Sequence, residues 1–173
     1  GKFAQCCAAI TGQLAAEERR VVGVTVTTFG VDGAPVDARG SLLYPIISWI
    51  CPRTAAVMAN IRKYFDPARL QQISGVGHFT FNTLYTFIWL RENRPDILDK
   101  TAHWLFISSL INHRLTGVFS TDRTMAGTSQ LFDLARDEFS EDILGKVGIS
   151  KSIFPKIVNP GEVIGQLHAD AAQ

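Results

Sequence analysis

The sequence has few cysteines and lacks long apolar runs. Three of the 173 residues are cysteine, and Cys6, Cys7 and Cys51 have neither metal-site spacing nor the even number of a disulfide framework. They predict free thiols in a reducing compartment. No apolar run approaches the ~18 residues that a membrane helix needs, and no apolar segment typical of a signal peptide follows Gly1. We therefore expect a cytoplasmic protein with no membrane partner.

The sequence also lacks an excess of charge of one sign. Lys and Arg number 17 against 16 Asp and Glu, interspersed along the chain. This balance argues against a nucleic-acid partner. Hydrophobic residues make up 46% and charged residues 19%, as in globular domains. The four histidines lie far apart and form no zinc motif, so we expect surface or capping roles for His78, His103, His113 and His168.

Valines alternate with small or polar residues over residues 21–28, and this period of two predicts a half-buried, central strand. A second short strand is expected at 34–37. Asp32 and Gly33 lie between the two, and Asp-Gly in that position is typical of a hairpin turn. A second interpretation is that Gly30 and Gly33 let the backbone come close to a ligand while the Asp32 carboxylate faces it.

Capping residues and helix breakers predict that the second half of the chain is rich in helix. Asp66 before Pro67 is a helix start, and Gly75 and Gly117 are helix stops. The same signals place helices near residues 3–14, 52–61, 67–74, 83–93, 95–100, 107–116 and from 141 onward. Residues 157–167 are strand-like, with a turn at 159–161. The fold class is therefore α/β, and no linker divides the chain.

Several segments, in this order, resemble the FGGY family of carbohydrate kinases. They are VVGVTVTTFGVDGAPVD from residue 21, FNTLY from residue 81, WLFISSLINHRLTG from residue 104, and TD with MAGTSQ over residues 121–130. The resemblance covers nearly the whole chain. It implies that residues 1–173 are a partial N-terminal lobe of the ribonuclease-H-like (actin-like ATPase) fold. The family's phosphate-binding Asp-x-Gly-x-Thr start and its whole C-terminal lobe, with the catalytic base and the ATP turns, have no counterpart here.

The resemblance implies an ATP-dependent, Mg²⁺-assisted kinase that converts L-fuculose to L-fuculose 1-phosphate. Two other interpretations remain open. The sugar could be another ketose, such as L-rhamnulose or D-xylulose, or the chain could be a non-catalytic domain that folds or oligomerises without turnover. We expect no catalytic residue, ATP or Mg²⁺ on this chain alone. Because the lobe's first strands are missing, an exposed sheet edge could favour a homo-oligomer.

By the same resemblance, this segment contributes sugar-binding residues. The Asp32 carboxylate can accept hydrogen bonds from two neighbouring sugar hydroxyls. Trp49 either packs in the core or lies against the carbon face of the sugar. Aromatic residues after a glycine-rich loop could close the edge of the site, although such residues are more often core. The expected substrate-binding set is Gly30, Val31, Asp32, Trp49, Phe81 and Asn82.

Overall fold

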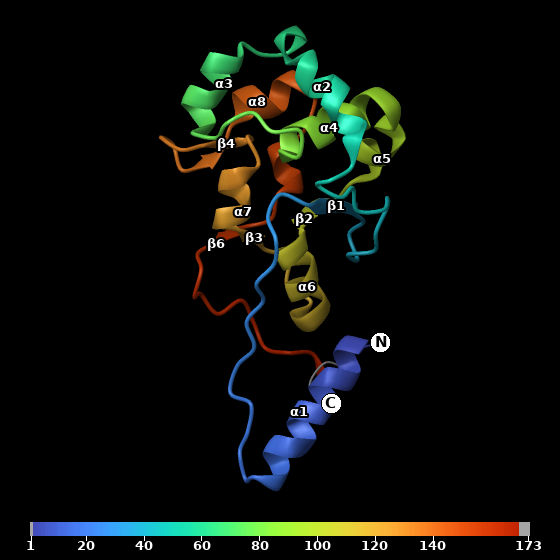
Figure 1. Ribbon diagram of the computed structural model, residues 1–173, viewed down its shortest axis with the longest axis vertical. Helices are drawn as coiled ribbons and strands as arrows, with labels where there is room; N and C mark the ends of the chain where they lie inside the picture. The colour runs from blue at the N-terminus through green and yellow to red at the C-terminus, as the bar shows by residue number, and fades with distance from the viewer. Residues whose placement is uncertain (1, 170–173) are drawn as a thin grey trace.

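The computed structural model describes residues 2–169. Over these residues, helices pack around three short two-stranded sheets, so the α/β expectation is confirmed (Figure 1). One long helix, α1, stands apart from the main body at the N-terminal end. The α-helices are α1 (Lys2–Ala16), α2 (Ala55–Ala59), α3 (Pro67–Ser74), α4 (Thr83–Asn93), α5 (Pro95–Lys100), α6 (Ile107–Thr116), α7 (Arg123–Thr128) and α8 (Glu141–Lys146).

The central pair of strands joins distant parts of the chain. Strand β1 (Gly33–Val36) runs antiparallel to β2 (His103–Phe106), with Gly33 opposite Phe106. Gly33 is required by this packing, because a Cβ there would lie 2.6 Å from the indole nitrogen of Trp104. The other pairs are β3 (Thr121–Asp122) parallel to β6 (Ile157–Val158), and β4 (Phe132–Asp133) antiparallel to β5 (Glu138–Phe139).

Helix α4 lies at the centre of the core. It carries apolar side chains on almost every side, as a fully buried helix does. The rings of Phe87 on α4 and Trp104 on β2 lie 4.5 Å apart between centroids, which joins the helix to the central strands. Helix-rich structure after residue 82 is therefore confirmed.

The helix ends predicted at Asp66, Gly75 and Gly117 are confirmed, whereas the helix expected over 52–61 is divided into a 3-10 turn (Pro52–Thr54) and α2 (Ala55–Ala59). The Asp66 side chain accepts a hydrogen bond from the backbone of Ala68 and caps α3. Gly75 ends that helix in the left-handed conformation with φ of 69°, and Gly117 ends α6 with φ of 72°. Ser140 caps α8 through the backbone of Ile143.

The predicted strand over residues 21–28 is wrong, and so is the hairpin with Asp32 and Gly33 in its turn. A strand needs a neighbour for its ladder hydrogen bonds, and no described segment pairs with these residues. They run as a connection from α1 to β1 (Figure 1), with Val22 88% exposed and Val24 52% exposed. The strand expected over 157–167 is formed only at Ile157–Val158.

The expected surface role of the histidines is wrong for His113, which is buried on α6. The centroid of its ring lies 4.2 Å from that of the Phe119 ring. The His103 ring also packs on Phe119, with the two centroids 4.3 Å apart. Burial lowers the pKa of both imidazoles below the usual histidine range. The positive charges of Arg114 and of the other histidines lower the pKa of His113 further.

Candidate functional site

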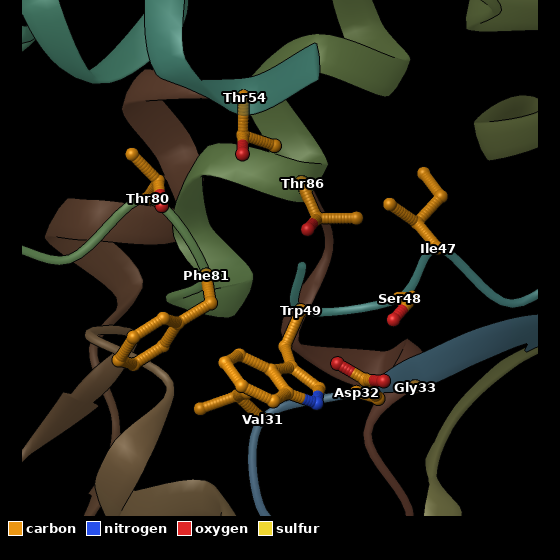
Figure 2. Close-up of a pocket in the computed structure, with 10 residues that line it drawn as sticks. All are labelled: Val31, Asp32, Gly33, Ile47, Ser48, Trp49, Thr54, Thr80, Phe81 and Thr86. Atoms are coloured by element: carbon orange, nitrogen blue, oxygen red, sulfur yellow. The ribbon is translucent and has the colours of Figure 1, made fainter. Parts of the chain in front are cut away.

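A hollow lies where the start of β1, the 47–54 segment, the 80–81 loop and α4 meet (Figure 2). About 280 Å³ of space lies in and at the mouth of the hollow, part of it open solvent. The hollow itself has room for about one water-sized group. The lining residues are Val31, Asp32, Gly33, Ile47, Ser48, Trp49, Thr54, Thr80, Phe81 and Thr86.

The backbone around Asp32 is fixed by hydrogen bonds. Val31 has φ of 68°, a left-handed conformation that costs energy for a β-branched residue. The Thr83 hydroxyl donates to the carbonyl of Val31 at 3.0 Å, and the Asp32 amide donates to the carbonyl of Gly30 at 2.9 Å. The amide of Ile107 donates to the Asp32 carbonyl at 3.0 Å. These bonds hold the strained turn, and the Asp32 carboxylate lies at the hollow.

The carboxylate of Asp32 is a buried anion without a cationic partner. The residue is 5% exposed, and among residues 2–169 no lysine or arginine forms an ion pair with it. Burial raises the pKa of this carboxyl, and a hydrogen bond from the Trp49 backbone partly offsets that rise. A buried carboxylate gains most from hydrogen-bond donors. A ligand with two neighbouring hydroxyls would supply them.

Aromatic side chains form one wall of the hollow. Trp49 is 50% exposed, so it is not a core residue, and its ring meets that of Phe81 edge-on at 6.3 Å. Phe81 stacks in turn on Phe79, with ring centroids 5.0 Å apart. Figure 2 shows Trp49 and Phe81 side by side at the hollow. Exposed aromatic faces of this kind suit the carbon face of a sugar.

Sequence reasoning missed four residues with hydroxyl side chains that line the hollow. They are Ser48, Thr54, Thr80 and Thr86. One signal was available, because Thr86 is a polar residue in the otherwise apolar middle of α4. The others lie on loops and at a helix start, where hydroxyl residues are common and carry no special information.

Two of the predicted site residues, Gly30 and Asn82, do not line the hollow. Asn82 is buried, and its amide donates to the Thr128 carbonyl at 3.1 Å and accepts from the Phe79 backbone at 2.7 Å. It therefore shapes the loop that carries Phe81. A Cβ on Gly30 would lie 3.9 Å from the Met125 sulfur, an ordinary contact, so space does not require glycine there.

The described residues contain neither a cluster of metal-ligating side chains nor a membrane-spanning helix. Among residues 2–169, no group of three or more His, Cys, Asp or Glu side chains could hold a metal ion. Within the same range, no helix has the length and apolar character needed to cross a membrane. The thiols of Cys6, Cys7 and Cys51 are free.

Comparison with known proteins defines the class. The N-terminal domain of the FGGY family of carbohydrate kinases matches residues 1–173, and the chain belongs to this family. Solved sugar kinases share its fold. The xylulose kinase of Rhodospirillum rubrum superposes with a TM-score of 0.87 at 24% identity, covering 95% of this chain and 34% of that one. The gluconate kinase of Lactobacillus acidophilus gives 0.85 at 19% identity, covering 94% and 33%. The expected actin-like ATPase fold is thereby confirmed.

The chain is also similar in sequence to particular members of that family. The chain is 58% identical to L-fuculokinase of Salmonella typhi over 172 residues, which cover 99% of this chain and 36% of that protein. It is also 58% identical to L-fuculokinase of Escherichia coli K12 over 171 residues, with the same coverage. The chain therefore spans about a third of the length of these relatives.

Proposed function

We propose that this chain is the N-terminal part of a cytoplasmic, ATP-dependent kinase that converts L-fuculose to L-fuculose 1-phosphate. In this proposal the chain supplies residues that bind the sugar. The buried, unpaired carboxylate of Asp32 beside an exposed aromatic wall is the observation that carries it. The 58% identity to L-fuculokinases supports the choice of sugar.

The residues of the hollow would act by positioning. Asp32 would accept hydrogen bonds from two sugar hydroxyls, while Trp49 and Phe81 cover a carbon face. Holding the sugar in one orientation lowers the entropy cost of bringing its terminal hydroxyl to the phosphoryl donor. ATP and Mg²⁺ would supply the phosphoryl group and charge neutralisation. From the resemblance to the family, we place these and the catalytic base outside residues 2–169.

A kinase for another ketose is the second candidate. Several solved neighbours are xylulose kinases, but their identity to this chain is below 25% and indicates the fold alone. L-Rhamnulose also remains a candidate, because a carboxylate and an aromatic wall suit any sugar with neighbouring hydroxyls. The third candidate is a domain without turnover of its own.

A panel of sugars tests these candidates. The full-length kinase that we propose contains this chain would be assayed by ADP release with L-fuculose, L-rhamnulose and D-xylulose. We expect the highest kcat/KM with L-fuculose, and no turnover by the 173-residue chain alone. A higher kcat/KM with another ketose would change the substrate, and absence of turnover with every sugar would leave the non-catalytic interpretation. Turnover by the chain alone, with contaminating kinases excluded, would show that our placement of the base is wrong.

A further inference from the structure

We propose that Thr54 and Thr86 form a second recognition point in the hollow, where they bind a sugar oxygen that Asp32 does not hold. This inference rests on the proposed function, because it concerns the same sugar. It assigns specificity to two residues outside the set expected from the sequence. The pair would distinguish ketoses by the oxygen presented at this point.

Both residues are largely buried, but their hydroxyls make no hydrogen bond to the chain. Thr54 is 3% exposed and Thr86 is 9% exposed, and neither hydroxyl forms a side-chain hydrogen bond in the part of the chain that the structure describes. Thr54 occupies the N-cap of α2 without making a capping bond. A helical threonine often donates to the carbonyl four residues earlier, as Thr101 and Thr116 do at 2.8 Å. Thr86 makes no such bond.

Neither hydroxyl is among the fully buried side-chain oxygens that lack a partner, so each still reaches solvent at the lining of the hollow. A ligand that displaces this solvent must offer the two hydroxyls hydrogen bonds, because a polar group left unpaired on burial costs free energy. In Figure 2, Thr54 and Thr86 lie on the same side of the hollow, with Trp49 and Asp32 below them. A group that enters the hollow from solvent can therefore reach both hydroxyls.

The chemistry of the two recognition points differs. An ionised carboxylate only accepts hydrogen bonds, so Asp32 can hold only donors, such as sugar hydroxyls. A threonine hydroxyl both donates and accepts. Thr54 and Thr86 can therefore bind either a hydroxyl or an oxygen without a proton, such as the carbonyl oxygen of an open-chain ketose. The hollow has room for about one such group.

Valine substitutions test the pair, because valine keeps the shape of threonine and removes only the hydroxyl. Binding of L-fuculose to the full-length kinase would be measured by titration calorimetry for Thr54→Val, Thr86→Val and the double variant. We expect each single variant to weaken binding roughly tenfold. Thr54→Ser should keep most of the affinity, because it keeps the hydroxyl. Neither valine variant should lower the melting temperature without sugar, because neither hydroxyl makes a hydrogen bond to the protein that the substitution would remove.

Thr101→Val is the matched control. Thr101 is as buried as Thr86, lies outside the hollow, and donates to a backbone carbonyl. Its valine variant should lose stability and keep its affinity for L-fuculose. The proposal is overturned if the wild type binds L-fuculose and both hollow variants bind it equally well. It is also overturned if those variants lose stability as the control does. A wild type that binds none of the three ketoses would overturn the proposed function together with this inference.

Discussion

Asp32 is the residue on which the proposed sugar site depends most, and two substitutions separate its roles. Asp32→Ala removes both carboxylate oxygens and leaves any bound hydroxyls unpaired. Asp32→Asn keeps the shape and one acceptor oxygen but removes the charge. Because no hairpin turn exists at this position, a role in turning the chain no longer competes with a role in binding.

The expected loss follows from hydrogen bonds to a charged group, which contribute about 1.5–3 kcal/mol each. Asp32→Ala should therefore reduce kcat/KM for the sugar roughly ten- to hundredfold, while the KM for ATP stays nearly constant. Asp32→Asn should lose less, since one acceptor remains. The free energy of unfolding should increase in both variants although sugar binding weakens, because burial raises the pKa of this carboxyl in the folded state. A raised pKa means that the ionised form destabilises the folded chain.

The pH dependence tests this reasoning without any sugar. Below the ordinary aspartate pKa of 3.8 the carboxyl is protonated in both states, so wild type and Asp32→Asn should unfold alike. As the pH rises through the folded pKa, the wild type should lose stability relative to the variant. Denaturant unfolding of both proteins from pH 3.5 to 7 would measure the difference. A variant that is less stable at neutral pH and binds sugar normally would refute a ligand role for Asp32.

Three further predictions concern the rest of the chain. Gly40→Ala should destabilise the fold by about 1–3 kcal/mol, because Gly40 has φ of 81° and a Cβ would lie 2.2 Å from the His113 ring. Gly12→Ala in α1 meets nothing within 4 Å and is the control in the same denaturant titration. The lowered pKa values of His103 and His113 predict that stability present at neutral pH is lost as the pH falls below about 6.5, and His113→Gln should flatten this dependence in thermal melts. The exposed valines of residues 21–28 should promote self-association at high concentration, which light scattering would contradict by finding only monomer.

Local signals in the sequence predicted the helix boundaries well. The Asp66 cap and the glycine stops depend on hydrogen bonds within a few residues and on backbone conformations that glycine adopts readily. Neighbouring residues in the sequence therefore carry nearly all the information. The family resemblance added the fold, which the structural neighbours support.

Non-local pairing was much harder to predict. The alternation over residues 21–28 fits a strand, but only a partner strand can make it one, and its own residues do not specify that partner. Strand β1 pairs instead with β2, about 70 residues later. The threonines of the hollow were equally hard to predict, because they are supplied by separate segments that meet only in the folded chain.

The predicted residues that do not line the hollow still contribute to its shape. Asn82 joins the loop that carries Phe79 and Phe81 to the backbone of Thr128, and the next residue, Thr83, joins α4 to the carbonyl of Val31. The aromatic wall and the strained turn before Asp32 are thus fixed from two successive positions at the start of α4. Because both bonds are largely shielded from water, losing either would leave polar groups unpaired and let the two walls move apart. In the proposed sugar site, Asn82 would therefore act through the position of Phe81, without touching the sugar.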